Sequence, residues 1–523
     1  MKKICRYHSL FVIRYSLFII LCSSFIQSEA QSIQVTLLDT SHQKISKYIY
    51  GHFAENLGRC IYDGFWADSN LNVPKNDRIR LDLVDALKKI HIPDLRWPGG
   101  CYADQYHWSD GIGDKSKRQV RVNTTWGMVS DDNTFGTDEF LKLCGMLGCE
   151  PYIAGNIGTG TPHEMEDWLE YLNYNGKSTL SDLRRKNGHD SPYHVSLWGV
   201  GNESWGCGGQ MTPEFYVTQF KRYAEFCKDY PGTHIRKVAS GANSDDYDWT
   251  EVCMKNIPWW DMFALSMHYY TLVDGWDHKG SATDFNEDQY FKGLKNCLHI
   301  EELINKHSAI MDKYDPEKRV ALAVDEWGIW TDVEPGTNPA FLYQQNSLRD
   351  ALIAASTLNI FNNHCDRVRM ANLAQTVNVL QSLVLTNKEK MLLTPTYYVF
   401  DMYQYHQNAT LIPLQFASPE YIFSGDSINA VNASASKDSN GVIHITLVNL
   451  DTRKKITMNT LLQNISSKNI QGEILTSQKF NDINTFDNPG KVKTTTFNDY
   501  KTSKNELSVN MPPMSVVLIT LKQ

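Results

Sequence analysis

The stretch HVSLWGVGNESWGCGG, residues 194–209, joins an apolar, strand-like run to a glycine-rich loop, with Asn202 and Glu203 at the junction. Continuous apolar runs are typical of strands in a parallel sheet, because such a sheet is buried on both faces. In an α/β barrel the working residues lie at the carboxyl ends of the strands. The stretch therefore predicts a buried parallel strand with a carboxylate at its functional end, and Glu203 needs a partner elsewhere in the chain.

Apolar segments that end in Gly, Asn, His or a carboxylate recur along the chain, separated by longer stretches whose apolar residues have helical spacing. The segments are residues 48–58, 92–100, 150–160, 194–203, 236–243, 260–270, 318–328 and 366–378. Eight buried strands alternating with helices over roughly 330 residues predict an α/β fold of the (β/α)8 TIM barrel type. A doubly wound open sheet is the alternative, but no Gly-x-Gly-x-x-Gly turn follows the first strand.

The pattern changes after about residue 405, where short β-branched and alternating segments are separated by turn-rich stretches, as in residues 441–450 and 515–521. This pattern predicts a C-terminal all-β sandwich domain. The strand-like residues 32–39 precede the barrel, and we expect them to join that sandwich. The predicted division is a signal peptide at 1–30, an N-terminal strand within 31–47, the barrel at 48–405 and the sandwich at 406–523.

The first 30 residues differ from the rest of the chain. Four basic residues precede the apolar run at 15–26, and Ser28 and Ala30 fit cleavage before Gln31. The pattern predicts a signal peptide and a periplasmic or extracellular protein. A retained membrane anchor is disfavoured because the run is shorter than the roughly 20 residues that span a bilayer. A lipoprotein site at Cys22 is a further alternative.

Composition excludes several classes of function. The net charge of −8 gives no support for a nucleic-acid partner. No His-x-x-x-His, Cys-x-x-Cys or nucleotide-binding motif occurs, so we expect no metal and no cofactor. Removal of residues 1–30 would leave nine cysteines, an odd number, and most of them are expected to be buried thiols.

Three of the predicted strand ends carry glutamates, namely Glu55 after the first, Glu203 at the fourth and Glu326 at the seventh. The ends of strands four and seven face each other across the pocket of a barrel. Two facing carboxylates are what glycoside hydrolysis requires, one as a proton donor and the other as a nucleophile or a base. Either glutamate alone is more often a helix cap or an ion-pair partner, but the two together at these strands favour catalysis.

Polar and aromatic side chains near the other strand ends are further candidates for the pocket. They are Asn156, Asn202, Trp205, His268, Tyr270, Trp327, Trp330, Gln375 and Asn378. The tryptophans are expected to pack on sugar rings, and Tyr270 to orient the nucleophile. His268 has the alternative of a satisfied core histidine. Arg96 and Asp104 are interpreted as holding the loop after strand two, without a chemical role.

Six motifs in order carry a family resemblance that covers nearly the whole chain after residue 31. They are YGHFAENLGRCIYDGFW (50–66), LRWPGGCYADQYHWSDGIG (95–113), NTFGTDEFLKLC (133–144), GNESWGCGG (201–209), DEWG (325–328) and MANLAQTVNVLQSL (370–383). The chain resembles glycoside hydrolase family 51, the α-L-arabinofuranosidases. The resemblance implies a retaining, exo-acting enzyme with Glu203 as acid/base and Glu326 as nucleophile. It also implies a furanose pocket that includes Glu55, Asn202, Tyr270 and Gln375.

The expected partners follow from the resemblance. They are arabinan, arabinoxylan or derived oligosaccharides, and family members are commonly homo-oligomers. The chain departs from the family at Cys101, where many members have asparagine and where a contact to a sugar hydroxyl is expected. We hypothesise a Cys101–Cys207 disulfide at the rim of the pocket, with two contacting thiols as the alternative.

Two other functions remain open at this point. A related glycosidase of the same clan, such as an endo-glucanase or a β-xylosidase, would keep both glutamates and change the pocket around Glu55, Cys101 and Gln375. A non-catalytic carbohydrate-binding protein on a barrel scaffold would have no need of Asn202, Glu203 and Glu326 together.

Overall fold

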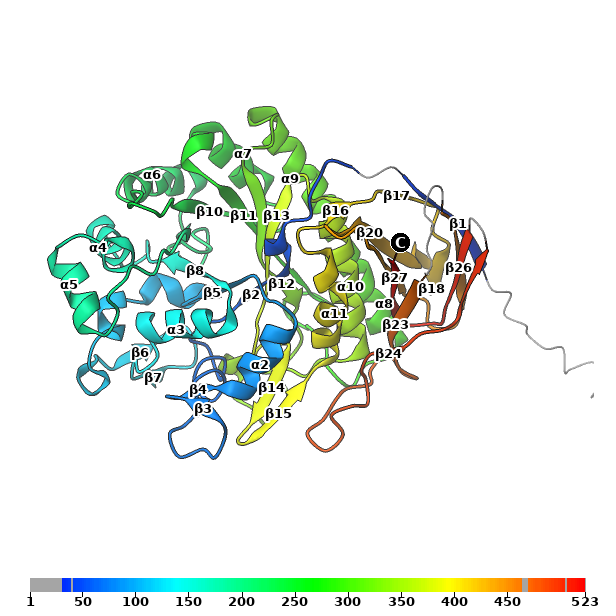
Figure 1. The fold of residues 1–523 in the computed structure, drawn as a ribbon, viewed down its shortest axis with the longest axis horizontal. Coiled ribbons are helices and arrows are strands. Elements are labelled where there is room, and N and C mark those ends of the chain that lie inside the picture. The colour runs from blue at the N-terminus through cyan, green and yellow to red at the C-terminus, as the bar shows by residue number, and fades with distance from the viewer. Residues whose placement is uncertain (1–30, 39–40, 463–468, 504–505, 523) are drawn as a thin grey trace, which may run out of the picture.

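The structure, a computed structural model, describes residues 31–38, 41–462, 469–503 and 506–522. Its larger part is a closed barrel of parallel strands surrounded by helices, and its smaller part is a pair of β-sheets (Figure 1). In order around the barrel the strands are β10 (Arg236–Asn243), β11 (Ala264–Thr271), β12 (Ala321–Ile329), β13 (Val368–Leu373), β2 (Gly51–Phe53), β5 (Asp94–Trp97), β8 (Glu150–Gly155) and β9 (Leu197–Val200).

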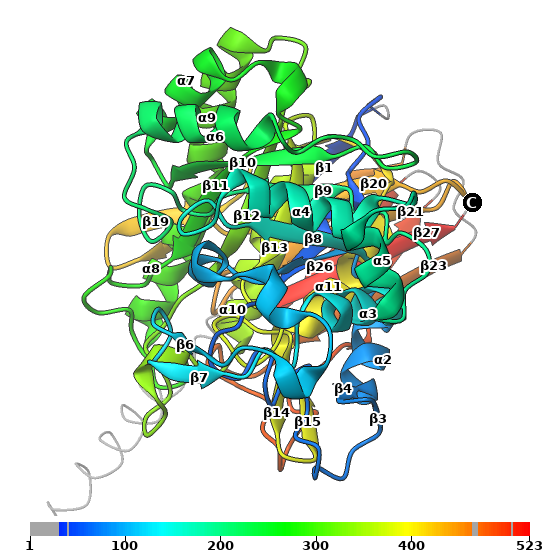
Figure 2. The same ribbon diagram turned by 90° about the vertical axis from the view of Figure 1, so that its left-hand side faces the viewer.

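Each of the eight predicted segments matches one barrel strand, with β11 and β12 each ending one residue beyond its segment, so the predicted barrel is confirmed. All four residues of β9 are buried, as the uninterrupted apolar run predicts for a strand covered on both faces. β9 pairs in parallel with β8 on one side and with β10 on the other. Because its strands are parallel, the closed sheet brings the carboxyl ends of all eight strands to one rim. Figure 2 shows helices α4 (Pro162–Asn173) and α6 (Pro213–Ala224) beside the barrel strands β8, β9 and β10.

The helices pack on the outside of the barrel, and several begin at a residue whose side chain accepts a backbone N–H. Thr161 and Thr212 cap two of them and are each followed by proline, which suits the first turn of a helix. The helices are α2 (Leu81–Lys89), α3 (Thr137–Leu147), α4 (Pro162–Asn173), α5 (Thr179–Lys186), α6 (Pro213–Ala224), α7 (Tyr247–Asn256), α8 (Glu287–Leu298), α9 (Ile300–Tyr314), α10 (Leu348–Asn363) and α11 (Pro395–Tyr403).

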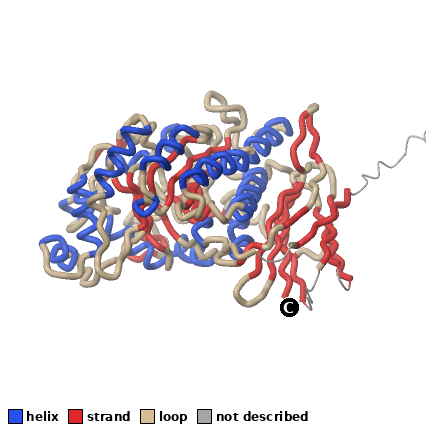
Figure 3. Tube along the Cα trace, turned by 90° about the horizontal axis from the view of Figure 1, so that it is seen from above, coloured by secondary structure: helices blue, strands red, loops and turns tan. Residues whose placement is uncertain are grey.

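Two antiparallel-rich sheets form the predicted sandwich, which lies beside the barrel (Figure 3). One sheet contains β17 (Leu414–Gln415), β1 (Gln31–Leu37), β22 (Ile456–Leu461), β26 (Glu506–Met511) and β25 (Tyr500–Ser503). The other contains β16 (Thr410–Leu411), β20 (Val431–Lys437), β21 (Ile443–Asn449), β27 (Ser515–Lys522), β23 (Asn469–Thr476) and β24 (Thr495–Thr496). β1 pairs in parallel with β22, so the N-terminal strand joins the sandwich as predicted.

Short hairpins extend several loops of the described chain. They are β3 (Lys75–Asn76) with β4 (Ile79–Arg80), β6 (Arg121–Asn123) with β7 (Val129–Asp131), β14 (Val384–Asn387) with β15 (Lys390–Leu393), and β18 (Glu420–Phe423) with β19 (Asp426–Asn429).

Helix α10 lies between the barrel and the sandwich (Figure 1). It contacts β12 on the barrel side and β20, β21 and β27 on the sandwich side. Because the helix covers the face of β21 that would otherwise meet water, every residue of β21 is buried. The alternating pattern expected for this strand from its sequence is therefore not a pattern of burial.

Asn359 of α10 makes a polar link across this contact. Its side-chain oxygen accepts hydrogen bonds from Ser434 Oγ at 2.7 Å and from Thr446 Oγ1 at 2.8 Å, and all three residues are buried. Asn359→Ala is expected to lower the free energy of unfolding by about 1–3 kcal/mol, because two buried hydroxyls lose an acceptor. Calorimetric unfolding checks this. The control is Asn363→Ala in the same helix, which is expected to cost less because the exposed Asn363 makes a single hydrogen bond to the sandwich, to Ala433 O at 2.9 Å. Equal effects of both substitutions would contradict the prediction.

The described residues contain no helix that is both long and apolar enough to cross a bilayer. The predicted signal peptide at residues 1–30 lies outside the described residues. Seven described cysteines are free, and six of these are buried, as predicted.

Candidate active site

The three predicted glutamates lie together at the carboxyl rim of the barrel. Glu55 follows β2, Glu203 lies in the loop after β9, and Glu326 lies within β12. One carboxylate oxygen of Glu203, one of Glu326 and a ring nitrogen of His268 all lie within 4.8 Å of one another. In retaining glycosidases the two carboxyl groups are about 5–5.5 Å apart, and in inverting enzymes about 6.5–9.5 Å. The closest oxygens of Glu203 and Glu326 are thus near enough for the shorter, retaining range.

Arg96, on β5, contacts the Glu326 side of this pair. Its Nη1 donates to Glu326 Oε1 at 2.8 Å, its Nη2 donates to Asn202 Oδ1 at 2.5 Å, and its Nε lies 3.8 Å from Asp325 Oδ2. Arg96 therefore belongs to the site, and the interpretation that it only holds a loop is wrong. An arginine between Leu95 and Trp97 in a strand predicted to be buried is the sequence signal that could have identified it.

Asp104 does hold its loop, as predicted. Its carboxylate accepts backbone N–H groups from Ile157 at 2.8 Å, Gly158 at 2.9 Å and Asn202 at 3.2 Å. These bonds tie the loops after β8 and β9 to η2 (Cys101–Gln105), and so they fix the position of Asn202 beside Glu203.

His268, on β11, lies between the carboxylates. Its Nδ1 is 2.9 Å from Glu203 Oε1 and 3.6 Å from Glu326 Oε2, and its Nε2 is 3.2 Å from Asp325 Oδ1. Burial opposes a charge on the ring, but Glu326 and its carboxylate neighbours outweigh burial and raise the pKa of His268 to about 10. His268 is therefore an imidazolium at neutral pH and donates from both nitrogens. Sequence reasoning missed Asp325, although two successive acidic residues in an apolar strand are unusual.

The raised pKa of His268 makes stability depend on pH. The folded protein keeps a proton that the unfolded chain releases above the ordinary pKa of 6.5. The contribution of this proton to folding stability is complete below pH 6.5 and is lost as the pH rises through about 10. The deficit in melting temperature of His268→Asn relative to wild type is therefore expected to shrink between about pH 7 and about pH 10.

The control for this prediction is His52→Asn. His52 is also buried, but burial lowers its pKa to about 3, so it carries no charge over this range. The deficit in melting temperature of His52→Asn relative to wild type is expected to stay constant with pH. Parallel curves for the two variants would contradict the assignment of a charged His268.

Glu55 occupies the far side of the site and accepts three N–H groups. They come from Tyr102 N at 3.0 Å, Trp126 Nε1 at 2.9 Å and Gln375 Nε2 at 2.8 Å. Burial, assisted by the charge on Glu326, nonetheless raises the pKa of Glu55 to about 7. The predicted residues Glu55 and Gln375 are thus in contact, and Trp126 joins them from a loop that carries no recognisable motif.

Glu203 and Glu326 have different surroundings. Glu326 accepts a hydrogen bond from Arg96 Nη1 and another from Tyr270 Oη, each at 2.8 Å. The side chain of Glu203 is half-buried, with 16% of it exposed. Its partial burial and the charge on Glu326 raise its pKa, although His268 acts in the opposite direction. Glu203 also has a backbone φ of +40°, a strained value for a residue with a side chain. The pair therefore consists of one carboxyl group held by two donors, Glu326, and one whose pKa is raised, Glu203.

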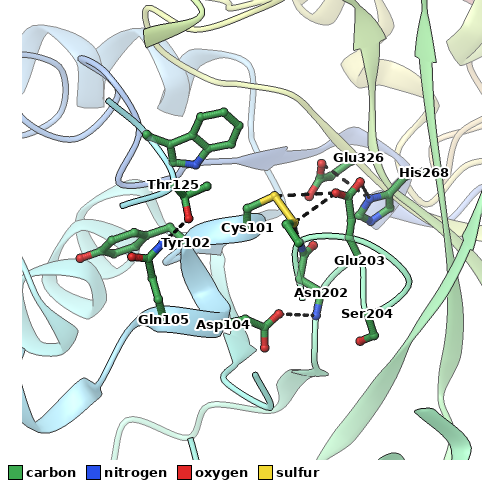
Figure 4. Close-up of a disulfide and its surroundings, with 12 residues drawn as sticks. Cys101, Tyr102, Asp104, Gln105, Thr125, Asn202, Glu203, Ser204, His268 and Glu326 are labelled. Atoms are coloured by element: carbon green, nitrogen blue, oxygen red, sulfur yellow. Dashed lines mark hydrogen bonds and ion pairs between the residues drawn. A yellow bond between two sulfur atoms is a disulfide. The ribbon is translucent and has the colours of Figure 1, made fainter. Parts of the chain in front are cut away.

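Cys101 and Cys207 form a disulfide, which confirms the hypothesis drawn from the sequence. Their sulfur atoms lie 3.8 Å and 3.4 Å from Glu203 Oε2. Figure 4 shows the disulfide on one side of the Glu203 carboxylate and His268 on the other. The bond joins the loops that follow β5 and β9, so it covers one flank of Glu203.

Three predicted residues do not reach the carboxylates. Trp327 is buried on the opposite face of β12 and packs against Phe361 and Phe400, because successive residues of a strand point to opposite faces. The expectation that Trp327 stacks on sugar is wrong. Asn156 and Asn378 make hydrogen bonds within and between loops instead.

A cavity of about 610 Å³ opens beside Glu203. Trp205 and Trp330 line it, as expected, together with Tyr270 and with Trp276, which sequence reasoning missed. The Trp276 and Trp330 rings meet edge to face at 5.3 Å between centroids, and 57% of Trp276 is exposed. Tryptophan faces next to a pair of carboxyl groups are suited to the apolar faces of sugar rings.

Comparisons with known proteins agree with this geometry. The family model for the α-L-arabinofuranosidase 1 domain matches residues 86–288, and that for the α-L-arabinofuranosidase C-terminal domain matches residues 325–515. A Bacteroides ovatus protein named an intracellular exo-α-L-arabinofuranosidase is 48% identical over 96% of this chain and 98% of its own.

Two solved structures are also similar. The GH51 arabinofuranosidase from Xanthomonas axonopodis pv. citri is 45% identical with a TM-score of 0.92, over 94% of this chain and all of its own. The α-L-arabinofuranosidase from Thermotoga maritima, in an arabinose complex, is 31% identical with a TM-score of 0.83 over the same shares.

The first of these relatives corrects one prediction. Because the Bacteroides ovatus protein is named intracellular and matches almost the whole chain, the prediction of a periplasmic or extracellular location is wrong, and the predicted signal peptide gains no support from this relative. Basic residues before a short apolar run are a compositional pattern, and the small residues at a cleavage site are too common to establish processing.

Proposed function

Because the chain belongs to the α-L-arabinofuranosidases of glycoside hydrolase family 51, we propose that Glu203 and Glu326 perform its reaction as acid/base and nucleophile. The chain is a glycoside hydrolase that removes terminal α-L-arabinofuranosyl residues. The observation that carries the assignment of roles is the difference between the two carboxylates. Glu326 accepts from Arg96 and Tyr270, whereas burial raises the pKa of Glu203.

In the first step Glu326 attacks the anomeric carbon while Glu203 donates its proton to the departing glycosidic oxygen. The bond from carbon to the leaving oxygen breaks, and an ester bond to Glu326 forms. Arg96 and Tyr270 hold the Glu326 carboxylate in place for the attack, so little reorganisation is needed. His268, held by Asp325, keeps its charge and orients Glu203 through Nδ1.

In the second step Glu203 accepts a proton from water, and the water oxygen attacks the anomeric carbon. The ester to Glu326 breaks and arabinose leaves with its configuration retained. The ester removes the negative charge that helps to raise the pKa of Glu203. The loss of this charge lowers the pKa of Glu203 when it must act as a base.

Substrate-binding roles are proposed for the residues around the pair. Glu55, with Gln375 and Asn202, would bind hydroxyls of the arabinofuranose ring, because these polar side chains lie beside the reacting carboxylates. Cys101 would border the ring through its disulfide. The cavity lined by Trp205 and Trp330 would receive the rest of an arabinan, an arabinoxylan or a shorter oligosaccharide.

The test is hydrolysis of a panel of aryl glycosides, namely α-L-arabinofuranoside, β-D-xyloside and β-D-glucoside, followed by NMR of the first product. Cleavage of the arabinofuranoside with retention supports the proposal. Preferred cleavage of a xyloside or glucoside would favour a related clan enzyme. Release of arabinose with inverted configuration would contradict the assignment of Glu326 as the nucleophile.

For the domains, we propose the division into residues 31–47, 48–405 and 406–523. It is supported by the end of α11 at Tyr403 and by the start of β16, the first strand of the sandwich after the barrel, at Thr410.

A further inference from the structure

Two sulfur atoms and a carboxylate oxygen lie close together on the flank of Glu203. Cys207 Sγ is 3.4 Å and Cys101 Sγ is 3.8 Å from Glu203 Oε2. A disulfide sulfur has no proton to donate, so neither contact is a hydrogen bond in the oxidised protein. The contact of two sulfur atoms with this carboxylate oxygen therefore has no part in the glycosidase reaction.

The two sulfur–oxygen distances match edges of a metal coordination tetrahedron, and the sulfur–sulfur edge, about 3.8 Å, opens once the disulfide bond is broken. Zinc binds thiolate sulfur at about 2.3 Å and carboxylate oxygen at about 2.0–2.2 Å, which places sulfur and oxygen ligands about 3.6 Å apart. The two measured sulfur–oxygen distances lie on either side of that value. The Cα atoms of the two cysteines are 5.4 Å apart, so both thiols remain next to Glu203 after the bond is broken.

We propose that reduction of the Cys101–Cys207 disulfide turns this flank into an inhibitory site for a thiophilic divalent cation such as Zn²⁺, held by both sulfurs and Glu203. A dithiol supplies the two electrons and two protons: it becomes a cyclic disulfide, and the Cys101–Cys207 bond becomes two thiols. Binding of the cation then releases the two thiol protons to solvent.

The surroundings give the cation access from solvent. They also keep one coordination position free for a water molecule. Cys207 is exposed and Cys101 half-buried, so the site is reached from solvent. His268 lies at Oε1, on the other side of the carboxylate, where its two nitrogens face Glu203 and Asp325. His268 is therefore not the fourth ligand, and a water completes the tetrahedron.

Inhibition follows from the position of the cation, and this part rests on the proposed function of Glu203. A cation on Oε2 withdraws the lone pair that must carry the proton, and it occupies space beside the leaving oxygen. Oxidation removes both thiolate ligands, so the disulfide protects the enzyme. The redox state of one cysteine pair would thus decide whether the glycosidase is sensitive to zinc.

The test uses the full chain in two states, as isolated and after reduction by a dithiol that is removed without air. Co²⁺ is titrated first, because cobalt thiolate bonds give a charge-transfer absorption band that requires no activity. Zn²⁺ is then added to displace it, and hydrolysis of an aryl α-L-arabinofuranoside is measured in parallel. The variants are Cys101→Ser and Cys207→Ser, with Cys149→Ser as the matched control, because Cys149 is half-buried beside a second cysteine, Cys144.

The expected result is a cobalt band of one equivalent in reduced wild type and in Cys149→Ser, and no such band in the oxidised protein or in the other two variants. Zn²⁺ is expected to lower the activity of reduced wild type at least about tenfold and to leave the oxidised enzyme unchanged. No band on reduction, or an equal band in Cys101→Ser, would overturn the site. A band without loss of activity would overturn the inhibition. An enzyme inactive on arabinofuranosides would refute the proposed function alone, because the cobalt band does not depend on it.

Discussion

Glu326→Ala is expected to lower kcat/KM for an aryl α-L-arabinofuranoside by roughly 10⁵-fold, because it removes the group that forms the covalent intermediate. Glu326 is fixed by hydrogen bonds from Arg96 at 2.8 Å and from Tyr270 at 2.8 Å. Steady-state kinetics measure the loss. Asp332→Ala, an exposed carboxylate just after β12, is the matched control and is expected to keep wild-type activity.

Azide separates this role from a general loss of structure. In Glu326→Ala the removed side chain leaves room for azide to attack the anomeric carbon directly, while Glu203 still donates its proton. The product is then the β-arabinofuranosyl azide, with inverted configuration, and the rate rises with azide concentration. An α-azide, or no rescue in a variant that melts at the wild-type temperature, would show that Glu326 is not the nucleophile.

Glu203→Ala is expected to show an effect that depends on the leaving group. With an arabino-oligosaccharide the first step needs protonation of a poor leaving group, so kcat/KM is expected to fall about 10²–10⁴-fold. With a nitrophenyl arabinofuranoside the leaving group departs without an acid, so kcat/KM changes far less. The second step is then slow, and the covalent intermediate accumulates. A burst of nitrophenol and a low KM are the measurements that check this.

Azide gives the opposite stereochemical result in this variant. It attacks the intermediate on Glu326 and needs no general base, so the product is the α-arabinofuranosyl azide, with retained configuration. The burst disappears as azide removes the intermediate. An equal loss of kcat/KM for both classes of substrate would contradict a proton-transfer role for Glu203.

Much of the fold follows from patterns that are local in the sequence. Eight apolar segments separated by helical spacing identify a parallel barrel, because a strand covered on both faces has no polar side. The change of pattern after about residue 405 identifies the sandwich. Glu55, Glu203 and Glu326 were identified because they stand at strand ends, and a closed parallel barrel brings these ends to one rim.

Other parts of the site depend on contacts between distant residues. Arg96 and Asp325 carry charges inside buried strands, but their partners lie more than 50 residues away along the chain, and only the closed barrel brings them together. The direction of a side chain at a strand end is equally invisible in the sequence, so Trp327 was expected in the pocket and lies in the core.

The sequence by itself determined the barrel, the sandwich joined by β1, and the pair of glutamates, because periodicity and strand ends are written in neighbouring residues. Only the tertiary structure decided how the two glutamates differ. Arg96 and Tyr270 reach Glu326 from other strands, whereas His268 and the Cys101–Cys207 disulfide flank Glu203. Protonation depends on the dielectric and the charges within a few ångströms, and the fold alone determines which groups those are.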